Sequence, residues 1–506
     1  MNFASTLLDS LGHDIWSILP QLFLVVIATL MLWPGDLVIP KGEKGKWAIF
    51  TSGVILITGL LVLRTPEGEC FNRMFKVDGL TRGFQLLCVL GTLATIALSQ
   101  RVLNALREQT VEYYALLLYG LAGMLFLCGA SDLMTVYFSV ELMAICIYIL
   151  VAYLRTQNRG VEAGLKYFLL GAFSSGILLY GISLLFAAGG GTTTNLADLN
   201  YKLALAAPNQ GLLVYAGILM VLVGLCFKVA AVPFHMWSPD AYDGAPTPIT
   251  AWMATAPKAA ALAAFLRVFG TAFHGSLDQW SLPLQYVAAA SMILGNVAAM
   301  KQQSMKRLLA YSSIAHVGYM LLGVLANDLR VADLGVATGA RAVWLYMLIY
   351  IVMNTGAFAV VIHLQGKGEG ERIEDFRGLA RTRPLLAFSM MVFLLSLAGI
   401  PPLAGFFGKF YLFKLAVEQG YTTLVVIAML TSAISAYYYL GVVNQMYFGE
   451  PAEGETPAVS QGILAIVVTS MLLITVGTAF GPKLLKWTET VALEAPAAPE
   501  LQIGLR

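Results

Sequence analysis

Four ionisable residues stand inside stretches of the chain that are long and apolar enough to cross a lipid bilayer. They are Glu141, Lys228, Lys258 and Lys409. A charge at the centre of a membrane helix costs roughly 2.5–3.5 kcal/mol, so such residues usually face a protein interior or a hydrated path. Side chains that bind and release protons, spaced along such a chain, predict conduction of protons or other cations.

The elements that must position these residues are membrane helices. Of the 506 residues, 58% are hydrophobic and 12% are charged, which is not the composition of a soluble domain of this length. We therefore expect an all-α, polytopic membrane protein with about fourteen spans of roughly 20 residues each. The predicted spans are 15–33, 47–63, 80–99, 111–128, 133–153, 167–187, 212–233, 247–269, 282–300, 308–326, 344–363, 385–417, 422–448 and 462–480.

The distribution of Lys and Arg predicts the orientation. Numbered from the N-terminus, the odd loops between spans hold most of the basic residues, so the odd loops are expected in the cytoplasm and both termini on the outer, periplasmic side. The first apolar run is expected to stay as a helix. The net charge of +2 gives no electrostatic reason to expect nucleic acid as a partner.

Two spans carry helix-breaking residues close to a lysine. In the seventh span Pro233 follows Lys228 by five residues, and in the twelfth span Pro401 and Pro402 precede Lys409 in a glycine-rich stretch. Proline lacks a backbone donor and clashes with the preceding turn, so both helices should open. Non-helical backbone at membrane depth persists only where it is buried or lines a cavity. Because these two spans run in opposite directions, they are expected to belong to an inverted repeat.

The cysteines and histidines do not have the paired spacing of a metal, iron–sulfur or haem site. We therefore expect no cofactor or metal in this chain. The residues are Cys70, Cys88, Cys128, Cys146 and Cys226, with His13, His235, His274, His316 and His363.

Several motifs carry a family resemblance. Residues 234–248, which read FHMWSPDAYDGAPTP, closely resemble the antiporter-like subunits of proton-pumping respiratory complex I, and so do residues 307–314 and 401–409. Within that group the wording of 237–248 is most similar to the subunit N group. The resemblance covers essentially the whole chain. It implies a single transmembrane domain over 1–506, with three N-terminal helices (1–110), two inverted five-helix repeats (111–270 and 281–448) and a final helix and tail (460–506).

The resemblance also implies a role for each of the four buried charges. Glu141 matches a carboxylate that couples electrostatically to the lysine at Lys228, so that the protonation of each alters the other. Lys258 matches the central lysine that links two half-channels, and Lys409 matches the terminal proton donor toward the outside. For Glu141 and Lys228, the alternative is a static buried ion pair.

A second group of residues is expected to support the relay. His235 would share a face with Lys228 if the helix continued through the break, and simple polar packing is the alternative. Asp240 and Asp243 are expected to be ordinary solvated carboxylates in the following loop, with collection of protons at the cytoplasmic mouth as the alternative. Four residues of the tenth span are expected to bind water in the second half-channel, with helix packing as the alternative: Ser312, Ser313, His316 and Tyr319.

The function implied by the resemblance is proton translocation driven by electron transfer from NADH to quinone. The FMN, the iron–sulfur clusters and the quinone are expected in other subunits. The implied partners are other membrane subunits, including antiporter-like and small helical ones, and lipids, in a bacterial cytoplasmic membrane. Two alternatives stay open, an Mrp-type cation/proton antiporter subunit and a structural subunit whose charges conduct nothing.

Overall fold

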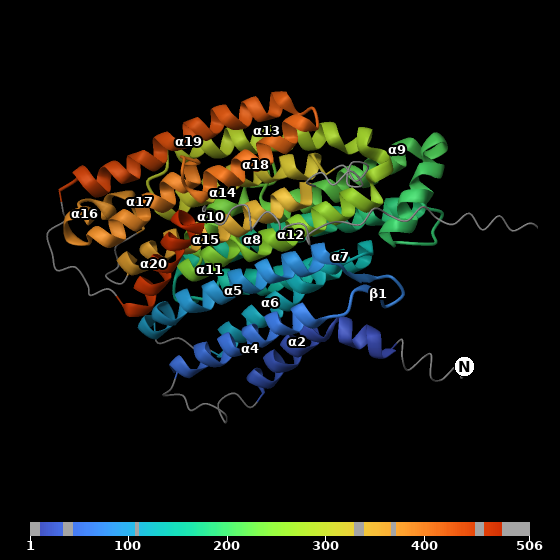
Figure 1. Ribbon diagram of the computed structural model, residues 1–506. Helices are drawn as coiled ribbons and strands as arrows, with labels where there is room; N and C mark the ends of the chain where they lie inside the picture. Colours follow the sequence, from blue (N-terminus) through green and yellow to red (C-terminus); the bar gives the residue numbers. More distant parts are fainter. Residues whose placement is uncertain are drawn as a thin grey trace, which may run out of the picture.

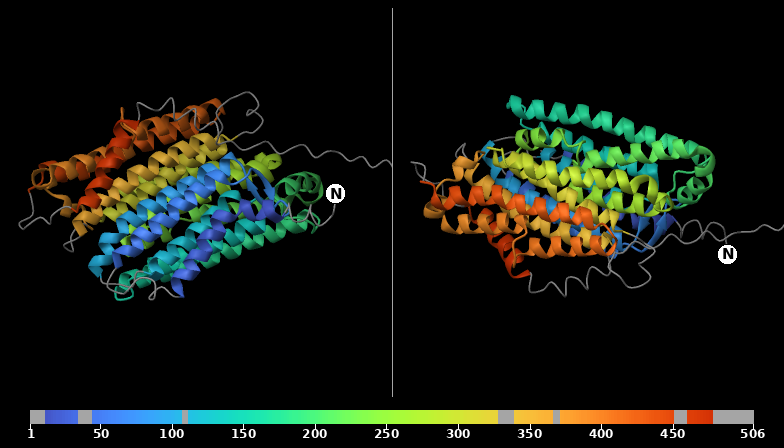
Figure 2. Two further views of the ribbon diagram at one scale, coloured as in Figure 1. Left: turned by 60° about the horizontal axis from the view of Figure 1, so that its bottom comes forward. Right: turned by 90° about the horizontal axis from the view of Figure 1, so that it is seen from above.

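The computed structural model describes residues 11–33, 44–106, 111–327, 339–365, 371–450 and 460–477. Over these residues the chain is a bundle of long helices that run side by side, up and down one common axis (Figures 1 and 2). One short hairpin, β1 (Gly68–Cys70) and β2 (Phe75–Val77), accompanies them. The expected all-α membrane class is confirmed.

The helices are best read in three groups along the chain. The first holds α2 (Leu19–Leu32), α4 (Lys44–Arg64), α5 (Gly79–Leu106), α6 (Val111–Gly129) and α7 (Leu133–Val151). The second holds α8 (Asn158–Ala188), α9 (Leu196–Val229), α10 (Trp237–Gly244), α11 (Thr247–Ala254), α12 (Ala256–Arg267), η1 (Val268–Ala272), η2 (His274–Ser276) and α13 (Leu277–Ala299). The third holds α14 (Met305–Leu325), α15 (Gly339–Gln365), η4 (Ile373–Phe376), α16 (Leu379–Thr382), α17 (Pro384–Ala398), α18 (Ala404–Glu418), α19 (Thr422–Phe448) and α20 (Gln461–Thr475).

The described helices are those of a multi-pass membrane protein. Eleven of them are long and apolar enough to cross a membrane, and the bent pair Leu11–Ser17 and Leu19–Leu32 would make a twelfth. Two further apolar helices, Pro384–Ala398 and Gln461–Thr475, are shorter. The count of about fourteen spans stays a prediction.

The two ends of the bundle are held by different contacts. At one end β2 pairs with residue Ala130, and Asp132, which caps α7, pairs with Asn195, which caps α9. At the other end, near α16, Ser304 pairs with Arg372. Figure 1 shows β1 and α16 at opposite ends of the long axis. The long helices between them therefore run parallel or antiparallel to this axis, from one end of the bundle to the other.

The two proline-containing spans are each interrupted in the same way. The helix α9 ends in Ala230, in the left-handed region at φ 61°, and α17 ends in Gly399 at φ 86°. The N–H of the residue after each bonds five residues back, from Ala231 to Cys226 and from Ile400 to Leu395. This is the Schellman ending, which satisfies carbonyls of the last helical turn at the point where the chain leaves the helix. The chain resumes as α10 and α18 after six and four residues respectively beyond these caps.

A third interruption was not expected from the sequence. The predicted span 247–269 is divided at Thr255 (φ −118°, ψ −86°) into α11 and α12. Pro257 cannot donate the bond that a continuous helix would direct at the carbonyl of residue 253, and the hydroxyl of Thr255 bonds the carbonyl of Ala251 at 2.8 Å. Both α11 and α12 are buried along their whole length. Lys258 therefore starts a new helix at the centre of the molecule.

A buried ion pair ties this central helix to the first group. The guanidinium of Arg267, near the end of α12, bonds both carboxylate oxygens of Asp78 at 2.8 and 3.0 Å and the hydroxyl of Thr81 at 2.8 Å. Both charged side chains are about 5% exposed or less. Two parallel bonds between a guanidinium and a carboxylate fix orientation as well as distance, so α12 is held against the start of α5.

The break before α18 depends on one glycine. The N–H of Gly405 bonds the hydroxyl of Ser396 at 3.0 Å, and a side chain at position 405 would collide with the backbone carbonyl of Ser396. We expect Gly405→Ala to cost about 3 kcal/mol or more, because backbone atoms cannot move aside. The amount of assembled complex on native gels should fall sharply.

The matched control for that change is Gly441→Ala in α19, where nothing lies within 4 Å of the added carbon. Alanine favours a helix over glycine by about 1 kcal/mol, so this variant should assemble normally. Equal amounts of complex from both variants would contradict the close packing of α18 on α17.

Candidate proton-relay site

The first pair of sequence-predicted charges lies together at the meeting of three helices. Glu141 comes from α7 and Lys228 from the last turn of α9, and the distance from Lys228 Nζ to Glu141 Oε1 is 3.8 Å. Ser175 of α8 stands between them. Its hydroxyl donates to Glu141 and accepts from Lys228 Nζ at 3.3 Å. The lysine side chain is 2% exposed and the glutamate 25%.

The central lysine has a different environment. Lys258, in the first turn of α12, is buried and donates to the hydroxyl of Ser313 on α14. Its Nζ lies 5.7 Å from the ring centre of Tyr242. Within the described ranges, no ion pair joins Lys258 to a carboxylate. The lysine is thus held by a hydroxyl and an aromatic ring, without a counter-charge.

Lys409 belongs to α18, and its side chain reaches back across the break to the end of α17. Its Nζ donates to the carbonyls of Leu397 and Ala398 at 2.9 and 3.0 Å and to the hydroxyl of Ser432 at 2.8 Å. It also lies 4.9 Å from the ring centre of Tyr319. The two carbonyls belong to the last turn of α17, where the helix dipole attracts a cation. The break therefore creates the lysine site.

All three lysines share one kind of partner. Each donates a hydrogen bond to a serine hydroxyl from a neighbouring helix. A hydroxyl can accept one hydrogen bond and donate another, so it can pass a proton on. Of the three serines, Ser313 was expected from the sequence to bind water, whereas Ser175 and Ser432 were not singled out.

The predicted residues of α14 lie between Lys258 and Lys409. His316 Nδ1 is 2.5 Å from the hydroxyl of Tyr346, and Ser312 is 2.5 Å from the hydroxyl of Tyr439. Tyr319 accepts from the amide of Asn296 at 3.1 Å. Their partners were not predicted, although each is a polar side chain within an apolar span. The structure thus places Ser312, His316 and Tyr319 in one buried polar layer.

His235 is placed differently from the geometry considered in the sequence. It lies in the non-helical segment between α9 and α10, so its spacing from Lys228 does not put the two on one helix face. The side chain is buried, and its Nδ1 has no hydrogen-bond partner among the described residues. A role for His235 in the relay stays a prediction.

Asp240 and Asp243 were expected in a solvated loop, but both lie on the short helix α10. The Asp240 side chain is solvated, at 38% exposed, whereas the expectation is wrong for Asp243, whose side chain is only 9% exposed. Asp243 pairs with Arg159 and accepts from the hydroxyl of Ser304 at 2.8 Å. Asp240 pairs with Arg307 at 3.0 Å. The segment after the break forms the short helix α10, which packs against α8 and α14. Its proline, glycine and aspartate residues favour a loop on local grounds, and a prediction from these residues does not include that packing.

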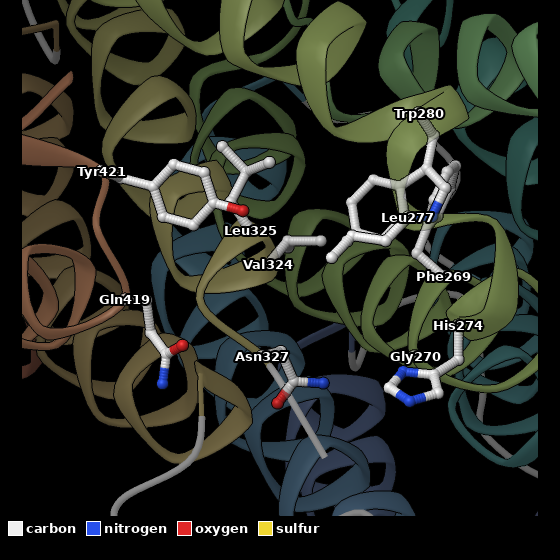
Figure 3. A pocket seen from close by; sticks show the side chains of 10 residues that line it. All are labelled: Phe269, Gly270, His274, Leu277, Trp280, Val324, Leu325, Asn327, Gln419 and Tyr421. Carbon is white, nitrogen blue, oxygen red and sulfur yellow. The ribbon is translucent and has the colours of Figure 1, made fainter. Parts of the chain in front are cut away.

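A small cavity of about 100 Å³ lies at the far end of α14. Figure 3 shows Asn327, Gln419 and Tyr421 on one side of it and His274 and Trp280 on the other. The amide nitrogen of Asn327 is buried and has no hydrogen-bond partner among the described residues. The helix α14 therefore runs from the Ser304 end of the molecule, past Lys258, to a polar cavity.

The described residues hold no group of three or more His, Cys, Asp or Glu side chains that could bind a metal ion. All five cysteines are free and buried.

Comparisons with known proteins agree on one family. Residues 130–435 match the family described as NADH:quinone oxidoreductase/Mrp antiporter, TM. The chain is 41% identical over 480 residues to the NADH-quinone oxidoreductase subunit N of Methylobacterium nodulans, covering 94% of this chain and 95% of the relative. It is 40% identical over 485 residues to subunit N 1 of Acidiphilium cryptum, covering 95% and 98%.

Solved structures share the fold of this chain. A chain of respiratory complex I from Thermus thermophilus with bound aureothin is 34% identical, with a TM-score of 0.77, over 93% of this chain and 98% of that one. A chain of the Mrp complex from a Dietzia species shares the fold at a TM-score of 0.75 and 21% identity, over 96% and 97%. By its identity to these relatives over nearly its whole length, the chain belongs to the subunit N family, among the antiporter-like membrane subunits of NADH-quinone oxidoreductase.

Proposed function

We propose that this chain moves protons across the bilayer through Glu141, Lys228, Lys258 and Lys409, as a membrane subunit of a NADH-quinone oxidoreductase. The observation that carries the proposal is the set of three buried lysines, each bonded to a serine hydroxyl on a neighbouring helix. Of these three lysines, only Lys228 has a carboxylate partner within the described residues.

The cost of burying charge supports a relay over a scaffold. A buried ion is expensive unless it is well paired, and apolar residues of similar size usually serve stability as well or better. Lys258 has neither a carboxylate partner among the described residues nor a headgroup layer within reach, because its helix is entirely buried. A lysine there has no evident structural use, whereas an amine can take up a proton and release it.

The four residues have distinct roles in this proposal. When the carboxylate of Glu141 is close, it favours the charged form of Lys228, and a shift in that carboxylate would release the proton. Lys258 then carries charge between the two halves. Lys409, bonded to the end of α17, releases the proton toward the outer side.

The surroundings of the chain follow from its relatives. They are named as subunits of NADH-quinone oxidoreductase, so we place this chain beside other membrane subunits, antiporter-like and small helical ones among them, and lipids. The FMN, iron–sulfur clusters and quinone belong to other subunits. The membrane is the bacterial cytoplasmic membrane, with both termini in the periplasm and the α16 end, which carries Arg159, Lys301 and Arg307, in the cytoplasm.

The matching Schellman endings of α9 and α17 support two repeats, over 111–270 and 281–448. An Mrp-type antiporter is less favoured, because the relatives above 30% identity are named NADH-quinone oxidoreductase subunits whereas the Mrp chain is 21% identical.

The proposal is tested at Lys409. Lys409→Arg keeps the positive charge and the hydrogen-bond donors that the carbonyls of Leu397 and Ala398 require, but arginine does not release its proton in proteins. We expect the complex to assemble and its pumping in sealed vesicles to fall at least about tenfold. A structural role would leave pumping intact, so a normal rate in Lys409→Arg would contradict the proposal.

A further inference from the structure

A charged cleft of about 720 Å³ opens at the α16 end of the bundle. Its walls come from the start of α8, the end of α10, the residues before α14 and the residues before η4. Six of the residues that line it are Arg159, Asp243, Ser304, Arg307, Glu371 and Arg372. In the orientation proposed above, this cleft faces the cytoplasm.

The cleft is not built to hold an anion, because its carboxylates already pair with its arginines. Arg159 bonds both Asp243 and Glu371, and Arg307 bonds Asp240 at 3.0 Å. An incoming phosphate or carboxylate would have to displace these partners. The network instead offers exposed acidic groups to water.

Beside the cleft lies a lysine that the proposed relay does not use. Lys306, in the first turn of α14, has a side chain that is only 3% exposed, and its Nζ lies 3.5 Å from Glu371 Oε1. The same Nζ donates to the carbonyl of Ala245 at 3.1 Å. Glu371 is 42% exposed. A buried amine thus touches a carboxylate that is open to solvent.

Two helices lead from Lys306 to Lys258. On α14, Ser313 follows Lys306 by seven residues, which puts both on one face about 10 Å apart, and Ser313 bonds Lys258. On α10, Tyr242 precedes Ala245 by one turn, and its ring lies 5.7 Å from Lys258 Nζ. Both amines therefore face the contact between α10 and α14, which Figure 1 shows at the centre of the bundle.

Several buried hydroxyls lie along this contact. Those of Ser238 and Tyr242 on α10 and of Tyr350 on α15 form no well-aligned hydrogen bond with a described residue. Ser313 lies within reach of both tyrosine hydroxyls, and Ser238 lies within reach of that of Tyr242. Buried polar groups are almost always satisfied by protein or by ordered water. A polar contact with several such groups suits a short chain of water molecules.

We propose that Lys306 is the entry group through which protons from the cytoplasmic cleft reach Lys258. The proposal rests on the relay proposed above. The ammonium of Lys306 gives one proton, through water between α10 and α14, to the neutral amine of Lys258, which becomes an ammonium. Glu371 takes up a proton from a hydronium ion in the cleft and passes it to the neutral Lys306, so that Lys306 is an ammonium and Glu371 a carboxylate again.

The first test is Lys306→Arg in the whole complex, in native membranes. Arginine keeps the positive charge and can still donate to the carbonyl of Ala245, but it does not release its proton. We expect normal assembly. Proton pumping, and the quinone reduction coupled to it, should fall at least about tenfold. The control is Lys414→Arg, an exposed lysine of α18 paired with Glu418, which should keep the normal rate.

A second variant covers the case in which arginine does not fit. Lys306→Ala should also lose pumping, and methylamine added to the medium should restore part of it, because a small amine can enter from the cleft and replace the missing group. A structural role for Lys306 would not be restored in this way.

The outcomes separate this inference from the relay itself. A normal rate in Lys306→Arg, or no response of assembled Lys306→Ala to methylamine, would overturn the entry role. If Lys258→Ala, measured in parallel, loses pumping while the Lys306 variants keep it, only the entry role fails. If Lys258→Ala also keeps pumping, the relay fails with it.

Discussion

Lys258→Ala is expected to leave the complex assembled and to lower proton pumping by about a hundredfold or more. A positioned acid or base contributes typically 10²–10⁴-fold to a proton transfer, and in the relay every proton crosses from one half to the other through this amine. Quinone reduction should fall with pumping, because the two are coupled in the proposed function. The measurements are complex content by native gel, quinone-reductase turnover and acidification of sealed vesicles.

The structure indicates that this substitution is compatible with folding. Lys258 makes one hydrogen bond, to Ser313, and its helix reads Ala-Pro-Lys-Ala-Ala-Ala, which alanine continues well. Removing a buried charge that lacks a carboxylate partner among the described residues offsets part of the cost of the cavity.

The control for Lys258→Ala is Lys414→Ala. Lys414 lies on a helix of the same site, but its side chain is 60% exposed and belongs to a surface ion pair. Such pairs are worth about 0–1 kcal/mol, so pumping should be unchanged. Unaltered pumping in assembled Lys258→Ala would remove the central step of the relay.

The sequence predicted the buried charges better than their partners. A lysine within an apolar span is conspicuous, because the cost of burying it must be offset by a function. A serine in the same span is not, because small hydroxyl residues are common where membrane helices pack. Ser175 and Ser432 became distinguishable only when the packing of α8 on α9 and of α18 on α19 brought each of them to a lysine. Ser313 was expected to bind water, but its bond to Lys258 was not predicted.

The interruptions of the helices show a similar limit. Two prolines among glycines predict a break on local grounds, as at Pro401 and Pro402. Pro257 is a single proline in an alanine-rich stretch, and the first turn of a helix tolerates a proline. Whether the preceding residues continue the same helix or belong to another is decided by packing, here by the burial of α11 and α12 on all sides.

Glu141→Gln is expected to slow pumping about tenfold while the complex still assembles. The amide keeps the shape of the side chain but cannot change its charge, so the protonation of Lys228 no longer responds to it. In a double-mutant cycle, Glu141→Gln should have almost no further effect once Lys228→Met is present, because the two residues act as one unit. The measurement is pumping by the two single variants and the double variant in sealed vesicles.

A static ion pair gives the opposite pattern at these positions. Breaking a buried pair costs about 3–5 kcal/mol when one charge is left alone, so Glu141→Gln would then lower the amount of complex and leave the pumping of each assembled complex normal. Glu418→Gln is the matched control. Its pair with Lys414 spans 3.7 Å against 3.8 Å for Glu141 and Lys228, but it lies on the surface. The two pairs differ in burial rather than in distance, so an effect at Glu141 that is absent at Glu418 must come from the buried setting.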